Sequence, residues 1–276
     1  MSTVTTEDFH FFAAYLKERS AITIGPGKEY LVESRLGPLA RDTGYADVGA
    51  LIGELRRPVP NATVRDRVVE AMTTNETSFF RDAHPFDALR NHVLPELVEA
   101  RKSSRRLSVW SAAASTGQEI YTIAMVLDGV PGLQGWDVRL HGTDLSEKVL
   151  DKARSGRFSA LEINRGLPAP MMVKYFERSG AEYVIEERLR KQCTFAQMNL
   201  AGTWGLLPTF DIVYCRNVLI YFDVPTRTEI LTKIRARLAP GGFLFLGAAE
   251  STLGVVDGYD QVRLGNTVAY RLGGSR

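Results

Sequence analysis

The chain has few of the residues that build disulfide frameworks or metal centres. Among 276 residues there are two cysteines and four histidines. Two cysteines are too few for a disulfide scaffold, and a structural zinc site usually takes four Cys or His ligands at short spacing. Cys193 and Cys215 both lie in apolar, strand-like runs, which predicts buried thiols in a reducing compartment. We therefore expect no metal site.

The sequence also lacks an excess of either charge and any long apolar run. Thirty-four Lys and Arg residues against 32 Asp and Glu give a net charge of +2, which argues against a nucleic-acid partner. No apolar run approaches the roughly 20 residues needed to span a bilayer. The first residues, MSTVTTEDFHFF, lack the basic segment of a signal peptide. A cytoplasmic protein without direct membrane insertion is expected.

The first part of the chain shows helical periodicity and no strand signal. Apolar residues at 9, 12, 13 and 16 share one helical face, and Thr5 or Thr6 can cap that helix. Further helices are predicted from the first-turn residue Pro26 to about residue 42, around 51–55 and around 64–72. We assign residues 1–74 to an all-helical domain for substrate recognition.

A polar and aromatic segment, TTNETSFFRD at 73–82, interrupts this periodicity, and a helix is predicted at about 85–101. We assign residues 75–101 to a linker and 102–276 to a second domain. There, strands and helices alternate, which predicts an α/β fold with a doubly wound parallel sheet. One helix is expected to end at Gly156, and another, at about 225–238, is expected to end at Pro240-Gly241-Gly242 before the strand FLFLG. A hairpin through Gly265-Asn266 predicts an antiparallel edge strand. The irregular residues at about 157–198 are predicted to form a small antiparallel β insert.

A small-residue turn follows the first predicted strand of this domain. Residues 111–117, SAAASTG, carry small side chains, so a ligand can approach the backbone closely. Asp144 ends the next predicted strand, where a carboxylate can accept both hydroxyls of a ribose. The pair indicates a nucleoside-containing ligand. The alternative is a tight turn and an Asp that only caps the helix beginning near Ser146.

The same turn lacks the patterns of a phosphate-binding loop. Neither G-x-G-x-x-G nor G-x-x-x-x-G-K-[ST] is present, and Gln118 and Glu119 follow at once. A carboxylate at this place would repel phosphates and suits a cationic ligand. S-adenosylmethionine carries a sulfonium and an ammonium group and no phosphate. The sequence therefore favours it over NAD or ATP.

Six ordered segments resemble one known family: TTNETSFFRD, VWSAAASTGQEIYTIAM, GTDLSEKVL, FAQMNL, FDIVYCRNVLIYF and LAPGGFLFLGAAES. They are similar to the chemotaxis receptor methyltransferases (CheR type), and the resemblance covers essentially the whole chain. It implies a Rossmann-like methyltransferase sheet. It also implies methyl transfer from S-adenosyl-L-methionine to receptor glutamate carboxylates in signal transduction, with S-adenosyl-L-homocysteine as product. The implied partner is the cytoplasmic helical domain of chemoreceptors, and a monomer is expected.

The resemblance also assigns roles to individual residues. It implies cofactor contacts by Asn75, Thr77, Arg81, Glu119, Asp144, Asn199, Leu200, Asn217 and Val218. Glu119 would lie near the methionine end and Asp144 at the ribose, with the 199–200 pair at the adenine and the 217–218 pair near the transferred methyl. We expect Arg81 to act as an electrostatic guide and Tyr221 as a positioning donor.

Several of these residues have plainer interpretations. Arg81 could pair with Glu76 or Asp82 on the surface, Asn199 could be a turn residue, and Tyr221 could belong to the core. Phe79 and Phe80 are interpreted as packing residues rather than ligand contacts.

The chain departs from the family pattern at four places. Gln118 replaces one of two usual acids, and Ala248-Ala249 stand where a His is common. The second helix keeps Lys28, Arg35 and Arg41 for docking on acidic receptor helices but contains Gly37-Pro38. Members that bind a receptor's C-terminal pentapeptide tether have a longer, glycine-rich turn where this chain has 178–181, RSGA. A tether-independent enzyme is expected, with substrate held by the helical domain and cleft.

The implied reaction needs no strong base, because a glutamate carboxylate is already ionised at pH 7. This agrees with a site that has no obvious catalytic His or Cys. Two alternatives remain: an S-adenosylmethionine-binding adaptor without catalysis, and a methyltransferase that acts on a small molecule or tRNA.

Overall fold

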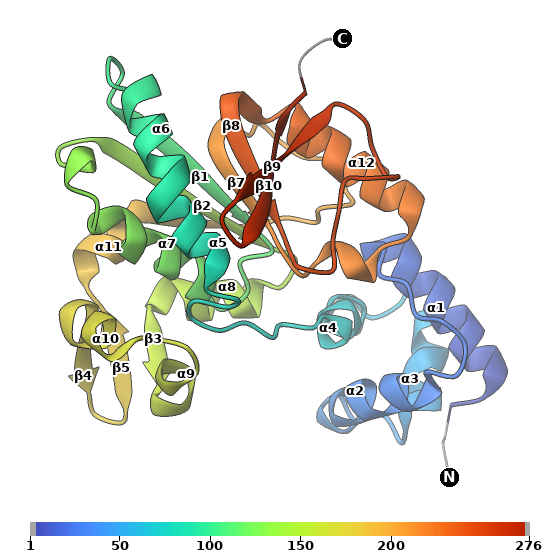
Figure 1. The fold of residues 1–276 in the computed structure, drawn as a ribbon. Helices are drawn as coiled ribbons and strands as arrows, with labels where there is room; N and C mark the ends of the chain where they lie inside the picture. The colour runs from blue at the N-terminus through green and yellow to red at the C-terminus, as the bar shows by residue number, and fades with distance from the viewer. Residues whose placement is uncertain (1–3, 274–276) are drawn as a thin grey trace. The chain divides into compact units, whose positions relative to one another are not determined.

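The computed structural model describes residues 4–273 and divides the chain into two compact units. One unit contains the residues up to Thr74 together with Tyr221–Thr226, and the other contains Asn75–Ile220 and the residues from Arg227 onward. Figure 1 shows the elements of both. Within residues 4–273 no helix is both long and apolar enough to cross a membrane.

The first unit is helical, as its periodicity predicts. Its helices are α1 (Thr6–Ser20), α2 (Glu29–Asp42), α3 (Val48–Leu55) and α4 (Ala62–Met72). Thr5 caps α1 in a reciprocal capping box with Asp8. Helix α2 begins at Glu29 rather than at Pro26, because Gly27 has a φ of 80° and places a turn before the helix.

One basic residue of α2 holds the unit together internally. Arg35 donates hydrogen bonds to the carbonyls of Met72 and Thr73 and to the hydroxyl of Thr74, at the end of α4. These carbonyls lack helical partners, so the guanidinium satisfies them. Arg35, which the resemblance assigned to receptor docking, is therefore engaged within its own unit, whereas Lys28 and Arg41 are exposed.

The second unit is built on a seven-stranded sheet with the order β6-β2-β1-β7-β8-β10-β9 (Figure 1). The strands are β1 (Arg106–Ala112), β2 (Asp137–Asp144), β6 (Cys193–Gln197), β7 (Phe210–Cys215), β8 (Leu238–Leu246), β9 (Tyr259–Leu264) and β10 (Thr267–Leu272). The first five run parallel, and β9–β10 form the predicted antiparallel hairpin. The predicted doubly wound sheet with an antiparallel edge is confirmed.

The helices of the second unit include a nearly continuous helical segment in the second half of the linker. It consists of α5 (His84–Ala88), a π-helical turn (Leu89–Val93) and α6 (Leu94–Ala100). The others are α7 (Gln118–Asp128), α8 (Glu147–Ser155), α9 (Ala160–Asn164), α10 (Ala169–Tyr175), α11 (Glu187–Gln192) and α12 (Val224–Arg235), with short 3₁₀ turns at Pro131–Leu133 and Leu219–Tyr221. Gly156, in a left-handed conformation, ends α8 as predicted.

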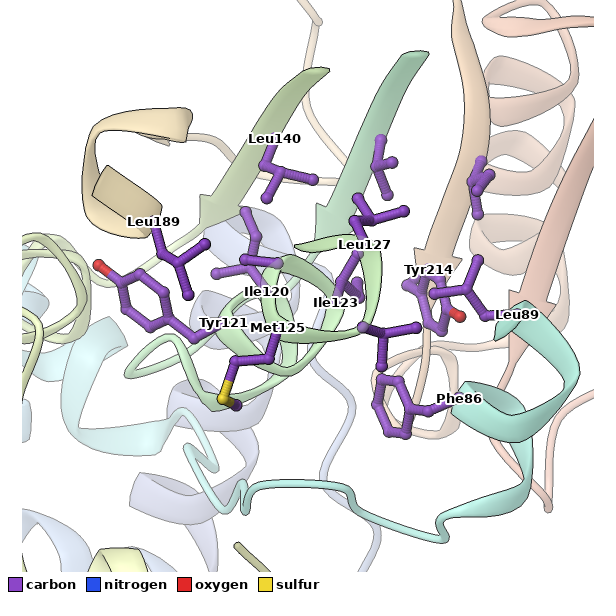
Figure 2. Packing of buried hydrophobic residues seen from close by; sticks show 14 of the residues in the cluster. Phe86, Leu89, Ile120, Tyr121, Ile123, Met125, Leu127, Leu140, Leu189 and Tyr214 are labelled. Atoms are coloured by element: carbon purple, nitrogen blue, oxygen red, sulfur yellow. The ribbon is translucent and has the colours of Figure 1, made fainter. Parts of the chain in front are cut away.

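The core of the second unit lies between the sheet and the helices on one of its faces. Figure 2 shows side chains of α7, including Ile120 and Ile123, together with Leu140 of β2 and Tyr214 of β7. Phe86 stacks on Tyr214 with their ring centroids 5.8 Å apart. The α7 residues from Ile120 to Leu127 are all buried, which makes α7 a core helix and fixes the turn that precedes it.

Two sequence predictions need correction here. Pro240-Gly241-Gly242 was expected to separate a helix from its strand, but it lies inside β8, which begins at Leu238 and shows a register shift against β7. The strand at 193–197 joins the main sheet, so the antiparallel insert ends earlier. It consists of β3 (Arg157–Ser159), β5 (Glu182–Ile185) and β4 (Phe176–Ser179), in that order.

Candidate functional site

The predicted site residues of the second unit meet at one edge of the sheet. Strands β6, β2, β1 and β7 are neighbours and parallel, with Asp144 opposite Gln197 and Ala112 opposite both Thr143 and Cys215. The segments that follow these four strands therefore leave the sheet side by side. Ligands of open α/β sheets bind at this carboxyl edge, where the strand order reverses, here between β1 and β7.

Asp144 is buried, and backbone N–H groups occupy part of the acceptor capacity of its carboxylate. Its side chain accepts from the N–H of Ser115 at 2.9 Å (Oδ2) and from the N–H of Ser146 at 3.0 Å (Oδ1). Burial raises the pKa of Asp144, and hydrogen bonds from the N–H groups of Ser146, Ser115 and Leu145 oppose that rise. Asp144 thus binds the start of α8, as the helix-capping interpretation predicts, and also holds the β1 turn, which neither of the two sequence interpretations anticipated.

The turn after β1 has an uncommon backbone. Ala113 and Ser115 have φ values of 67° and 50°, and Gly117 has a φ of 95°. Left-handed conformations of non-glycine residues cost energy and concentrate at functional sites. At Gly117 a Cβ would lie 3.0 Å from the Cβ of Ala153, so a glycine is required for the close approach of the turn to α8. Ala113 and Thr116 are the partly exposed residues of this turn, and the others are buried.

A buried arginine, Arg216, connects Glu119 to the linker. The side chain of Arg216 is 1% exposed. Its Nη1 donates to Oε2 of Glu119 at 3.0 Å, and its Nη2 donates to Oδ2 of Asp82 at 2.7 Å and to the carbonyl of Arg81 at 3.0 Å. The other oxygen of Glu119 accepts from the hydroxyl of Ser111 at 2.8 Å. Glu119 is therefore ionically paired and fixed in orientation.

The linker motif lies against the β1 turn. The carbonyl of Asn75 accepts from the Ser115 hydroxyl at 2.8 Å, so Asn75 contacts the site through its backbone, and Thr77 is half-buried. Arg81 donates to the carbonyl of Glu76 at 2.9 Å, while the Glu76 carboxylate pairs with Arg165. Arg81 thus reaches the residue named in its plainer interpretation, but through the backbone rather than as an ion pair.

The two phenylalanines of this motif pack as predicted. Phe79 is fully buried and meets Phe158 and Phe176 edge to face at 5.0 and 5.6 Å between ring centroids. Phe80 packs on Phe86 at 5.7 Å. The insert and the linker therefore share one aromatic cluster, which anchors Arg81.

Asn199 and Leu200 follow β6 beside Asp144, because the N–H of Met198 donates to the carbonyl of Asp144. The Asn199 side chain accepts from the N–H of Ala201 at 3.0 Å, which makes Asn199 a turn residue at the position where the resemblance also places a cofactor contact. Leu200 is buried, and its carbonyl accepts from the indole of Trp204.

The segment after β7 is held by a carboxylate from another loop. Asn217 has a φ of 58°, and its N–H donates to Oε2 of Glu250 at 2.8 Å. Oε1 of Glu250 accepts from the N–H of Val218 at 2.9 Å and of Leu219 at 2.7 Å. Asn217 and Val218 are thus fixed through their backbone beside Arg216.

Tyr221 belongs to the helical unit. Its carbonyl accepts from the N–H of Thr23 at 3.0 Å, and Asp223, two residues later, pairs with Lys17 at 2.8 Å. The hydrogen bond to Lys17 holds the pKa of Asp223 well below its usual range. The chain therefore passes from the sheet edge into the helical unit directly after Ile220.

A cavity of about 320 Å³ opens beside the buried arginine. Its walls include Arg216, Glu250, His84, Gln261 and Tyr270. The cavity is polar and lies at the end of β7 and β8 and at the β9–β10 hairpin, next to the segment that begins at Asn217.

Sequence reasoning missed Arg216 and Glu250. Arg216 directly follows the mostly apolar strand FDIVYC, and Glu250 lies four residues after the apolar strand end FLFL. A charge at such a place is buried and needs a partner, and this signal marks Arg216. Four of the five partners of Glu250 are backbone amides 30 to 33 residues away along the chain, and no side-chain pattern records them.

The donor set fits S-adenosylmethionine. Asp144 offers acceptor capacity for a ribose. Glu119 and Asp82 share the single counterion Arg216, so the three groups together keep a net negative charge that suits a cationic methionine end. Within residues 4–273, the one arginine buried at this edge, Arg216, is already neutralised by Glu119 and Asp82, so it is not free to bind a phosphate.

Comparison with known proteins agrees with this geometry. Residues 75–267 match the family domain described as CheR methyltransferase, SAM binding domain, and residues 7–73 match the CheR all-alpha domain. The chain is 38% identical over 269 residues to chemotaxis protein methyltransferase 1 of Pseudomonas aeruginosa, covering 96% of this chain and 97% of that one. It is 34% identical over 251 residues to the Escherichia coli chemotaxis protein methyltransferase, covering 88% and 85%. The chain belongs to the CheR methyltransferase family, and S-adenosylmethionine is its cofactor.

Proposed function

We propose that this protein transfers the methyl group of S-adenosylmethionine to glutamate side-chain carboxylates of chemoreceptors in the cytoplasm, forming methyl esters during sensory adaptation. The observation that carries the proposal is the similarity over nearly the whole length to a chemotaxis protein methyltransferase, with both family domains present. The site supports it because Asp144 and Glu119 lie at the edge where a cationic nucleoside cofactor binds.

The reaction moves one carbon and no proton. An oxygen lone pair of the ionised glutamate forms the new O–CH₃ bond while the S–CH₃ bond breaks and its electron pair stays on sulfur. When bound, S-adenosylmethionine supplies the electrophilic methyl group and becomes the neutral thioether S-adenosylhomocysteine. Since the nucleophile is already an anion at pH 7, the protein has to align the reacting atoms and exclude water.

The residues divide this work between two ends of the site. Asp144 holds the ribose by hydrogen bonds and Glu119 holds the methionine ammonium. The guanidinium of Arg81 guides the substrate carboxylate, and the Tyr221 hydroxyl positions it. Arg216 supports both ends, because it binds Glu119 through one nitrogen and the linker that carries Arg81 through the other.

We further propose that the receptor is held by the helical unit rather than by a tether. Lys28 and Arg41 are exposed on α2 and suit acidic receptor helices, while Arg35 is engaged internally. In the insert, Ser179 pairs with Glu182, so the turn between β4 and β5 contains only Gly180 and Ala181. A two-residue turn offers little backbone to an incoming peptide.

Labelled cofactor and purified receptor cytoplasmic fragments test the proposal directly. We expect base-labile label on wild-type fragments and none on fragments whose methylation-site glutamates are replaced by alanine. Cofactor binding without label on any receptor would identify an adaptor, and label on a small molecule or tRNA would identify another substrate class.

A further inference from the structure

The carboxylate of Glu250 accepts hydrogen bonds from several backbone N–H groups, and the proposed reaction assigns this residue no role. Oε2 accepts from the N–H of Asn217 at 2.8 Å and of Gly247 at 2.7 Å. Oε1 accepts from the N–H of Val218 at 2.9 Å, of Leu219 at 2.7 Å and of Ile220 at 3.3 Å. One carboxylate therefore collects five amide N–H groups, four of them from the successive residues 217–220.

These five donors exceed the roughly four lone-pair positions of a carboxylate. Glu250 is thus saturated by its own protein and has no capacity left for a ligand. The four successive amides point to one centre, which requires the left-handed φ of 58° at Asn217. Without an acceptor, these amides would be left unpaired at a partly buried position, which costs about 1–3 kcal/mol for each fully buried group.

The approach of the two loops leaves no spare space. A Cβ on Gly247 would lie 2.7 Å from Oε2 of Glu250 and 2.8 Å from the N of Asn217. The φ of Gly247 is not in the left-handed region, so the need for glycine here is steric. The end of β8 and the segment after β7 therefore form one fitted unit around the carboxylate.

We propose that Glu250 is a positioning residue for methyl transfer, fixing the backbone of residues 217–220 against the transferred methyl without touching cofactor or substrate. This rests on the proposed function, which places Asn217 and Val218 beside that methyl. Glu250 belongs to the loop after β8, three strands from β2 in the sheet, roughly 14 Å at about 4.8 Å per strand. Loss of the Glu250 carboxylate should therefore disturb the alignment of residues 217–220 with the transferred methyl and leave ribose binding at Asp144 unchanged.

The decisive variant is Glu250→Gln, which keeps the shape and replaces one acceptor oxygen by an NH₂ group that faces amide donors. We expect kcat to fall by about 100-fold, the scale of a misplacement near 1 Å. The dissociation constant of S-adenosylhomocysteine is expected to change by less than about threefold, as for distant independent sites. Rates are expressed per S-adenosylhomocysteine-binding site, so that unfolded protein does not count.

Two further variants keep the inference testable if Glu250→Gln folds poorly. Gly247→Ala retains the carboxylate and displaces Asn217, so it should reproduce the split between kcat and cofactor affinity. Glu162→Gln is the matched control, because the Glu162 carboxylate also accepts a backbone N–H, that of Ser159 at 2.7 Å, in the insert. It should leave kcat unchanged.

Amide hydrogen exchange measures the protection of residues 217–220 and does not depend on enzyme activity. Residues 217–220 should be protected in the wild type and lose protection in Glu250→Gln. Unchanged exchange there, an unchanged kcat per binding site, or an equal loss in kcat and cofactor affinity would each overturn the inference. A wild-type enzyme that labels no receptor would instead overturn the proposed function, while the exchange comparison would still judge the role of Glu250.

Discussion

Two carboxylates at the same edge of the sheet, one after β2 and one after β8, bind backbone amides and differ in what they leave free. Asp144 accepts from three N–H groups, of Ser115, Leu145 and Ser146, and Glu250 accepts from five. Against the roughly four acceptor positions of a carboxylate, Asp144 retains capacity for a hydroxyl and Glu250 retains none.

The difference teaches how one chemical group serves two purposes on one scaffold. A buried carboxylate that has unused acceptor positions can bind a ligand. A carboxylate whose acceptor positions are all taken by backbone N–H groups can only stabilise the fold around it. The β2 end is thereby suited to hold the cofactor, and the β7–β8 end is suited to hold a loop in a conformation that it would not otherwise adopt.

The largest expected effect concerns Arg216, the cation after β7 that joins α7 to the linker. Arg216→Met removes a charge that is 1% exposed and leaves Glu119, 13% exposed, without its counterion. Breaking a buried pair in this way costs about 3–5 kcal/mol, and we expect the lower end because Asp82 is 35% exposed. Denaturant unfolding measures the loss. A change below 1 kcal/mol would mean that Arg216 does not join α7 to the linker with any energetic consequence.

Arg81→Ala should separate the effect on catalysis from the effect on stability in the linker. The linker side chain makes one hydrogen bond, to the Glu76 carbonyl, so the melting temperature should change little. If its guanidinium guides the substrate carboxylate, kcat should fall by about 100-fold, or about 2.7 kcal/mol. Lys at the same position should recover part of the rate. Full activity in a protein that melts many degrees lower would make Arg81 structural.

Asp144→Ala tests the other side of the comparison. Loss of hydrogen bonds from ribose to a charged acceptor should weaken S-adenosylhomocysteine binding by about 1.5–3 kcal/mol. Titration calorimetry measures it, and kcat at saturating cofactor should remain closer to wild type than in Glu250→Gln. An unchanged affinity would remove the ribose assignment, and equal kcat losses in both variants would remove the distinction between the two acids.

The raised pKa of Asp144 gives a pH test of the same assignment. Because burial raises this pKa in the free protein, protonation begins above the usual range and favours the ligand-free state. Affinity for S-adenosylhomocysteine should therefore fall with acidification, by up to about tenfold per pH unit below the pKa. The stability that this group contributes changes in the opposite direction: it is present at low pH and lost as pH rises through the raised pKa. Calorimetry at acidic pH values above the usual Asp pKa of about 3.9 should show the fall in affinity in wild type and not in Asp144→Asn.

Sequence patterns were sufficient to predict the β2 end of the site, with Asp144, but not the β7–β8 end, with Glu250. The alternation of strands and helices placed Asp144 and the 111–117 turn at a shared edge, because carboxyl ends of parallel strands must meet there. The saturation of Glu250 depends on the φ of Asn217 and on the close approach of Gly247, which only the folded chain creates. The irregularity at 240–242 in β8 also appears only when β8 pairs with β7 in the folded sheet. The Pro-Gly-Gly sequence alone therefore predicted the end of a helix there.

The smallest expected effect concerns the insert, which lies outside both ends of the comparison. If the methyl-transfer machinery lies entirely at the sheet edge and the receptor is held by the helical unit, a receptor's C-terminal pentapeptide should not bind the insert. The insert offers only two short edge strands, β3 and β4, and strand addition needs a row of unpaired amides to give affinity. Titrating the free pentapeptide should give no heat of binding, and receptor fragments with and without the pentapeptide should be methylated at equal rates. Replacing Ser179 and Gly180 should alter neither result. A micromolar dissociation constant that these replacements abolish would contradict the prediction and would place a second recognition site on the β4 edge.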